Sequence, residues 1–128
     1  MTQNLITRLS KLDAPDRGMD AEIEVAVRRI EAARSGLAEE YWANWQASPD
    51  GTVYDPHTRY SSQPFTASVD AAIALAEKVL PGWTWSLFPH AAEIRHPKIR
   101  AKDQMAGGFN TATALCIALL RAKEASKL

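Results

Sequence analysis

Residues 65–88 read FTASVDAAIALAEKVLPGWTWSLF, and this stretch decides the fold. Thr66 or Ser68 can cap a helix, because a hydroxyl oxygen accepts the unpaired backbone N–H groups of a first turn. Apolar residues then recur at helical spacing until Pro81-Gly82, which ends the helix. The residues that follow, WTWSL, alternate large apolar with small polar side chains, as a half-buried strand does. The stretch therefore predicts a helix over about 67–80 and a strand over about 83–88.

Working outward from this unit, the remaining chain supplies its partners. Residues 92–96 predict the returning strand of a hairpin, and the polar segment 98–110 predicts a flexible loop. Residues 112–120 are apolar almost all the way round, so the last helix, about 111–125, should be the most buried element. Upstream, apolar spacing predicts helices over about 3–12 and 20–45, where Asp20 is a suitable N-cap and Gly36 a point at which the helix kinks or ends. Residues 52–54 suit a further short strand.

Composition places the chain among ordinary globular proteins. Its 128 residues are 46% hydrophobic and 23% charged, which predicts a single domain over 1–128. Helices and a small antiparallel sheet predict the α+β class, with three or four helices packed on the sheet as an α–β–α sandwich.

Charge and cysteine usage exclude several classes of protein. The formal net charge is zero, which disfavours nucleic acid and anionic membrane as partners. Cys116 is the single cysteine, so an internal disulfide framework is excluded and a reducing compartment is favoured. The first residues, MTQNLITRLSKLDAPDR, lack the apolar run of a signal peptide, and no run of about twenty apolar residues occurs. We therefore expect a cytoplasmic protein without a membrane span.

Four segments together resemble the phage ABA sandwich domain family, whose members are small proteins of bacteriophages and prophages. They are TASVDAAIALAEKVLPGWTWSL and ATALCIALLRAK, with LITRLSKL and MDAEIEVAV near the amino terminus. The resemblance spans most of the chain, although 28–45 is longer and more helical than the family pattern, and ALAEKVLPG carries extra residues. It implies an α–β–α sandwich and a phage or prophage origin in the bacterial cytosol. It implies no catalytic residue.

Chemistry sought directly in the residues is sparse. His90, Glu93 and His96 have a spacing that suits a metal on a helix, but on a strand Glu93 and His96 point to opposite faces. Cys116 lies in the most apolar helix, where a thiol is inert. No phosphate-binding glycine pattern and no nucleophile elbow occurs. We therefore expect neither an enzyme, nor a metal site, nor a cofactor.

A cluster of aromatic residues predicts a protein interface. Tyr41, Trp42 and Trp45 lie within five residues, near the end of the predicted second helix. A small sheet can hardly bury all three rings, and an exposed aromatic cluster usually marks a contact surface. The sequence thus favours a binding protein that forms a homodimer or binds a host, phage or defence-system protein, with residues 37–46 as the interface and Trp42 as its anchor.

Two segments keep a ligand- or nucleic-acid-binding module open as the alternative. Arg59, Tyr60 and Ser61 precede a helix start that could hold a phosphate, although Asp70 already supplies a negative charge there. Ordinary capping by Thr66 or Ser68 competes with that hypothesis. The second segment is basic, and its four cations within eight residues are Arg95, Lys98, Arg100 and Lys102. With aromatic side chains as stacking surfaces, it could bind single-stranded nucleic acid.

Overall fold

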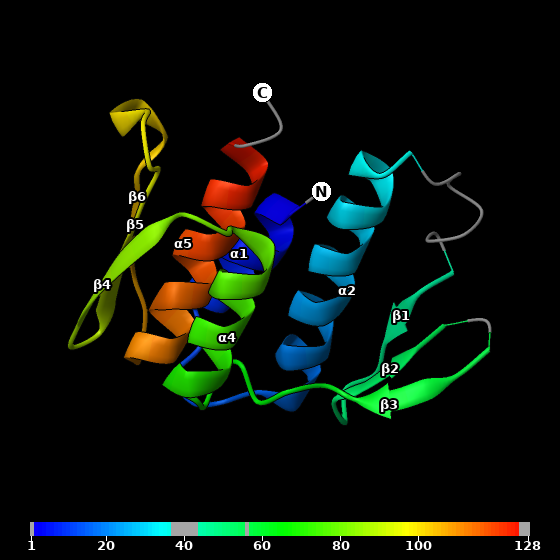
Figure 1. The fold of residues 1–128 in the computed structure, drawn as a ribbon. Helices are drawn as coiled ribbons and strands as arrows, with labels where there is room; N and C mark the ends of the chain where they lie inside the picture. Colours follow the sequence, from blue (N-terminus) through cyan, green and yellow to red (C-terminus); the bar gives the residue numbers. More distant parts are fainter. Residues whose placement is uncertain (1, 37–43, 56, 126–128) are drawn as a thin grey trace. The chain divides into compact units, whose positions relative to one another are not determined.

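The computed structural model describes residues 2–36, 44–55 and 57–125 (Figure 1). In this part the chain forms four α-helices and two three-stranded antiparallel sheets, so the predicted α+β class is confirmed. The chain divides into two compact units, which are described separately. The first unit comprises Met1–Pro15 and Phe65–Leu128, and the second comprises Asp16–Pro64. The single domain over 1–128 stays a prediction.

The sheet of the first unit has the strand order β4-β5-β6. The predicted hairpin is confirmed as β4 (Thr84–Phe88) and β5 (Ala91–Arg95). The predicted loop over 98–110 is wrong in part, because it contains the short 3-10 helix η1 (Arg100–Lys102) and the strand β6 (Gln104–Gly107). A strand of four residues carries little local signal, and β6 exists because it pairs with β5.

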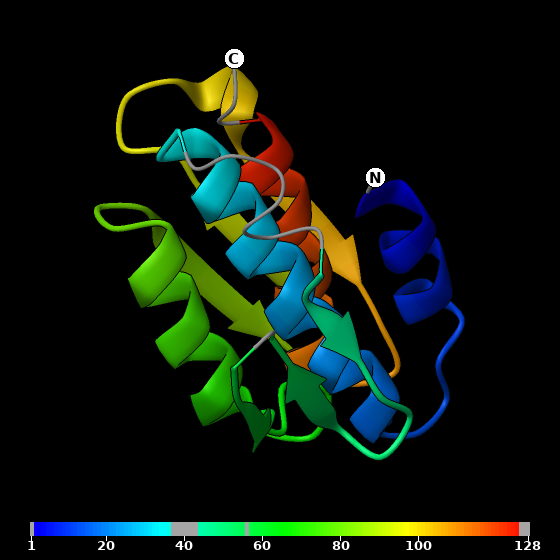
Figure 2. The ribbon, with the colours of Figure 1, turned by 90° about the vertical axis from the view of Figure 1, so that its right-hand side faces the viewer.

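Helix α5 (Thr111–Ala125) is the centre of the first unit. Every residue from Ala112 to Leu120 is buried, which confirms the predicted burial of this helix. One side of α5 contacts the sheet, and its other sides contact α1 (Thr2–Ser10) and α4 (Val69–Val79). Figure 2 shows α5 between α4 and α1.

The layers of the first unit are therefore sheet, then α5, then the two other helices. All three helices lie on one face of the β4–β5–β6 sheet (Figure 1). This order differs from the expected α–β–α sandwich, in which helices cover both faces of one sheet. The uncovered face carries polar and charged side chains at Ser86, Glu93 and Arg95, which suit contact with water.

One residue ties the starts of α4 and α5 together. The Asn110 side chain accepts from the Thr113 backbone N–H at 2.8 Å, which caps α5, and donates to the Thr66 carbonyl at 2.9 Å. Of the two predicted caps of α4, Ser68 is the one observed, since its hydroxyl accepts from the Ala71 N–H at 3.1 Å. Capping thus fixes both helix starts.

The second unit packs one helix on a small sheet. Helix α2 (Arg17–Arg34) faces the strands β1 (Gln46–Ala47), β2 (Thr52–Tyr54) and β3 (Arg59–Ser61), paired in that order. The predicted strand at 52–54 is confirmed, although it belongs to a second sheet and not to the sheet of the hairpin. Ala21, Val25 and Val53 form the core between helix and sheet.

Both ends of α2 differ from the predicted helix over about 20–45. The N-cap is Asp16, whose carboxylate accepts from the Met19 N–H at 2.9 Å, and Asp20 lies inside the first turn. The helix ends at Arg34, where the N–H of Ser35 bonds back to the Glu31 carbonyl and Gly36 takes a φ of +80°. Gly36 adopts this left-handed conformation without strain, so the helix stops although apolar residues continue the helical spacing.

Candidate functional site

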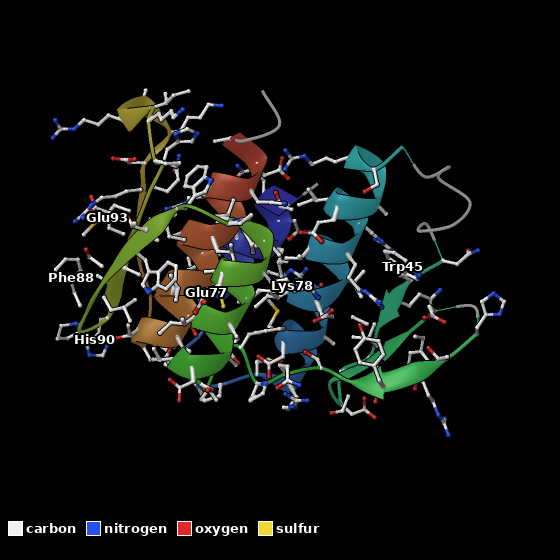
Figure 3. All side chains as sticks on the ribbon, in the orientation of Figure 1. Trp45, Glu77, Lys78, Phe88, His90 and Glu93 are labelled. Atoms are coloured by element: carbon white, nitrogen blue, oxygen red, sulfur yellow. The ribbon has the colours of Figure 1, made fainter. Side chains whose placement is uncertain are left out.

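The face of the β4–β5–β6 sheet opposite α5 carries exposed apolar side chains. The strand register places one set of side chains on this face, because directly paired residues point to the same side of a sheet. We call this set the open face; its members are Thr84, Ser86, Phe88, Ala91, Glu93, Arg95 and Met105. Figure 3 shows Phe88 and Glu93 projecting from the sheet on the side away from α4.

Two large apolar side chains dominate the open face. Phe88 is 44% exposed and Met105 is 57% exposed. The opposite face of the same strands is covered by α5, and its Ala92, Ile94 and Ala106 are buried. Large apolar groups left in water on one side of a sheet whose other side is packed are typical of a contact surface.

Between these apolar groups lies a charged network. The Arg95 guanidinium donates to the Glu93 carboxylate at 2.8 Å through Nε and to the Ser86 hydroxyl at 2.9 Å through Nη2. Arg95 is thus held flat across two strands by side chains of the same face. Its charge is balanced locally by Glu93, so Arg95 is not available as a separate cation.

The basic loop, residues 96–102, borders the open face and is shaped by His96. The Nδ1 atom of His96 accepts from the backbone N–H groups of Lys98 at 3.0 Å and Ile99 at 2.8 Å. The backbone N–H of His96 donates to Asp103 at 2.8 Å, and the imidazole meets the Trp83 ring edge-on with centroids 4.7 Å apart. The histidine is therefore the internal support of the loop.

The basic loop presents its cations outward. Lys98 and Arg100 are exposed, and Lys102 is half-buried. A shallow hollow lies between loop and sheet, lined by Glu93, Arg95, His96, Pro97, Lys98, Arg100 and Asp103. The acids in it are already engaged, Glu93 with Arg95 and Asp103 with the His96 backbone. The cations left for a ligand in this region are Lys98 and Arg100.

Tyr60, one of the residues in the predicted anion site, is held in a structural cluster of the second unit. Its hydroxyl accepts from Arg28 at 2.9 Å and donates to Glu24 at 3.1 Å. Burial, with the negative charge of Glu24 in addition, raises the pKa of Tyr60 to about 12. The Arg28 guanidinium also lies over the rings of Trp45 and Tyr60, at 5.1 and 5.4 Å. This stacked arrangement stabilises the unit without leaving the phenol free.

The other two residues of that predicted site have separate surroundings. The Ser61 hydroxyl accepts from Arg17 at 3.0 Å, and Arg17 also binds Asp20 and the Ser62 carbonyl. Arg59 is exposed and pairs across the sheet with Tyr54. The hydroxyl of Ser68, which lies at the expected helix start, is occupied by capping.

Of the predicted aromatic interface, Tyr41 and Trp42 lie outside the described residues. Trp45 is half-buried and packs against Ala21, Val25 and Val53, and its carbonyl accepts from Arg29. Its position is explained by packing inside the second unit. An interface at 37–46 stays a prediction.

Sequence reasoning did not single out Phe88 and Met105. The alternation over β4 carried the signal for Phe88, since it puts residue 88 on the face opposite Trp85 and Leu87. No comparable signal existed for Met105, because β6 was not predicted. The basic segment was found from composition alone. That it lies next to the open face is known only from the structure.

The remaining reactive groups are the possible metal ligands, Cys116 and His90. In the described ranges, no three His, Cys, Asp or Glu side chains are placed to hold a metal ion. Cys116 is buried, and its Sγ lies 3.6 Å from the Phe65 carbonyl. The His90 Nδ1 lies 2.6 Å from the Phe109 carbonyl, and Nδ1 must therefore carry the proton and donate it.

Two further findings bear on the class of protein. Among the described residues, no helix has the length and apolar character needed to cross a bilayer. Comparison with protein-family models, curated proteins and solved structures finds no significant match to this chain. Membership of the phage ABA sandwich domain family therefore stays a hypothesis based on the sequence resemblance.

Proposed function

We propose that this protein acts by binding another protein through the open face, and that it has no catalytic activity. The observation that carries the proposal is the pair of exposed side chains Phe88 and Met105 on a sheet face that no described helix of the first unit covers. Aromatic and methionine side chains are enriched where proteins meet. The Glu93–Arg95 pair between them supplies polar groups that fix the orientation of a partner.

The side chains with reactive chemistry support the same proposal, because they already serve the fold. Cys116 is enclosed in α5, His96 supports the basic loop, and Tyr60 is bound to Arg28 and Glu24. A catalytic group has to reach its substrate within hydrogen-bonding distance. Recruiting any of the three would dismantle a contact that holds its surroundings.

The chemistry of the partner follows from the surroundings of the open face. Lys98 and Arg100 lie in the loop that follows Arg95, at the end of the open face opposite Phe88, and the acids that line the same hollow, Glu93 and Asp103, are already engaged. A protein surface with an apolar group and, to one side of it, carboxylates complements this arrangement. A phage or prophage origin, a cytosolic location and a partner from the host or its defence systems are proposed on the sequence resemblance.

Site-specific photo-crosslinking in the cells that carry the gene tests this proposal. A photoreactive amino acid at Met105 should yield a crosslinked partner, whereas the same amino acid at Glu77, exposed on α4, should not. The crosslink from position 105 should be lost when Phe88→Ser is added, because the apolar centre is then broken. Equal crosslinks from positions 105 and 77, or a crosslink unaffected by Phe88→Ser, would overturn the open face as the binding surface.

The basic loop keeps nucleic acid as a second candidate ligand. Lys98 and Arg100 are exposed next to the half-buried Lys102, as a backbone-tracking groove requires. The tryptophans expected to stack on bases have other contacts: Trp83 contacts His96, and Trp85 pairs with Ile94 on the covered face.

Fluorescence anisotropy with a labelled single-stranded oligonucleotide over a salt series tests this candidate. Binding should weaken with salt and disappear in the double variant Lys98→Ala/Arg100→Ala. The control double variant Lys11→Ala/Lys78→Ala, which removes the same charge elsewhere, should bind as the wild type does. Absence of binding at low salt would exclude nucleic acid and leave the protein partner.

A further inference from the structure

Strand β4 has a free outer edge that lacks the usual protection. The strand order β4-β5-β6 leaves β4 paired on one side only, and no described strand pairs with its other side. Natural edge strands are short or carry charges, prolines or bulges that prevent pairing with another chain. The sequence of β4, TWSLF, has none of these and runs for five residues. The other edge, β6, has four residues and ends at Gly107.

The hairpin geometry fixes which backbone groups this edge presents. Phe88 pairs with Ala91, so the turn between them has two residues and Phe88–Ala91 is its hydrogen-bonded closing pair. Hydrogen-bonded and non-bonded positions alternate along an antiparallel pair. The N–H and C=O groups of Trp85 and Leu87 therefore point away from β5, toward the free edge.

We propose that β4 pairs antiparallel with β4 of a second copy of this chain, about a two-fold axis that passes beside Ser86. The two sheets then join into one sheet of six strands. Trp85 lies opposite Leu87 of the second copy, and their outward backbone groups bond to each other. Such an interface is isologous: both copies use the same surface, so assembly stops at a dimer.

Side-chain complementarity identifies the occupant of the edge as a second copy. In this register Leu87, 36% exposed, lies beside Trp85 of the second copy on the covered face. Phe88, 44% exposed, lies beside Thr84 of the second copy on the open face. Cross-strand contacts of this kind between aromatic and aliphatic or β-branched side chains are favourable. One symmetry operation thus covers both exposed apolar residues of β4.

The charges permit this pairing. No charged residue lies on β4, and the nearest charges are Glu93 and Arg95 on β5. In the joined sheet the backbones of the two β5 strands are about 14 Å apart, but each Arg95 guanidinium reaches across to the Ser86 hydroxyl beside the axis. Each guanidinium is paired with Glu93 of its own copy at 2.7 Å, so each copy brings a neutral ion pair, not a single charge, to the axis.

The first test is the oligomeric state of the full chain, measured by sedimentation over a range of concentrations. The wild type should reach a dimer, and Leu87→Lys should remain a monomer with unchanged circular dichroism. Met105→Lys is the matched control, since it places the same charge on an exposed apolar residue away from the β4 edge, and it should dimerise. A wild type that stays monomeric, or a dimer that survives Leu87→Lys, overturns the proposal, as does a dimer lost equally in Met105→Lys.

A designed disulfide tests the register. Ser86 faces Ser86 of the second copy as a non-bonded pair with Cα atoms about 4.5 Å apart, inside the range of roughly 4.4–6.8 Å that a disulfide bridges. Ser86→Cys should therefore form a covalent dimer under mild oxidation. Thr84→Cys should not, because the two Thr84 residues are about 13 Å apart along the strands. Equal crosslinking of both variants would exclude this register.

This inference does not depend on the binding proposed for the open face. A chain that dimerises through β4 but yields no crosslink from position 105 retains the edge proposal and loses the function. A monomer that gives the position-105 crosslink does the reverse. If an extended peptide from another protein occupied the edge, the wild type would be monomeric in isolation, and the second copy would be excluded.

Discussion

Single residues hold the second unit together, and the contact between Gly51 and the Arg17 side chain is the clearest case. Gly51 is buried, takes a φ of +94°, and would bring an added Cβ to 2.8 Å from the Arg17 Nε. Arg17 in turn binds Asp20, Ser61 and the Ser62 carbonyl, so its guanidinium joins the start of α2 to the end of β3. A side chain at position 51 therefore disturbs a contact that links three segments.

We predict that Gly51→Ala destabilises the protein more than Gly36→Ala does. Both glycines have a positive φ, which costs an alanine roughly 1–2 kcal/mol. A Cβ added at position 36 would have no atom of the described residues within 4 Å, whereas one at position 51 must also displace Arg17. Urea denaturation of the two variants measures the difference in the free energy of unfolding. Equal losses would show that the Arg17 contact contributes nothing.

Tyr60 makes the stability of the protein fall with rising pH in the alkaline range. Burial, then the charge of Glu24, raises the pKa of Tyr60 from 10.0 to about 12, and Arg28 opposes the shift in part. A pKa raised on folding means that the folded state holds the phenol proton more tightly. This contribution is fully present below about pH 10 and is lost as the pH rises through about 12. Tyr60→Phe should therefore show a smaller loss of stability between pH 10 and pH 12 than the wild type, by denaturant titration. Parallel curves for the two proteins would contradict the assignment.

At the scale of elements, the basic loop depends on one acceptor atom. His96 Nδ1 satisfies the N–H groups of Lys98 and Ile99, and no regular strand or helix supplies those bonds. His96→Ala should accelerate hydrogen exchange at these two amides and leave exchange in α5 unchanged, because the hydrogen bonds that His96 makes to Lys98, Ile99 and Asp103 all lie within residues 96–103. His57→Ala, at an exposed turn of the second unit, is the matched control. Unchanged protection of Lys98 and Ile99 would mean that the loop is held by other contacts.

The elements predictable from sequence were those with local signals. The α4–β4 unit was found because a serine cap, a Pro81-Gly82 stop and an alternating strand follow one another within 24 residues. The second helix was predicted to reach about residue 45 because Tyr41 and Trp45 continue the helical spacing, with Gly36 named as a point where it kinks or ends. The helix ends at Arg34, and Gly36 has a positive φ. Strand β6 was missed because it depends on β5, which is a tertiary partner.

In the candidate site, too, residues with a local sequence signal could be predicted, and residues placed by tertiary pairing could not. The basic composition of the segment identified Lys98 and Arg100. The alternation along β4 indicates that Phe88 points to the face opposite Trp85 and Leu87. Met105 joins them only through the pairing of Glu93 with Met105 across β5 and β6. A surface assembled from two segments by strand register has no signature in either segment alone.

At the scale of the whole molecule, each compact unit has its own set of buried apolar residues in the described part of the chain. In the first unit α5 is enclosed by the sheet, α1 and α4, with Leu115, Ile117, Leu119 and Leu120 fully or nearly fully buried. Between α2 and its sheet, the core of the second unit comprises Ala21, Val25 and Val53. Because apolar burial supplies most of the stabilisation, the β1–β2–β3 sheet should open at lower free energy than α5 does.

Native-state hydrogen exchange with one core substitution tests this difference. Leu119→Ala should lower the free energy of global unfolding by about 2–5 kcal/mol, as removal of a buried leucine side chain does. Amides in the middle of α5 exchange through global unfolding, so their protection should fall by that full amount. Amides of β2, such as that of Val53, exchange through local opening of the second unit and should keep their protection until global unfolding becomes the easier route. An equal fall in α5 and β2 from the outset would show that the two units open only together, as a single cooperative domain over 1–128 does.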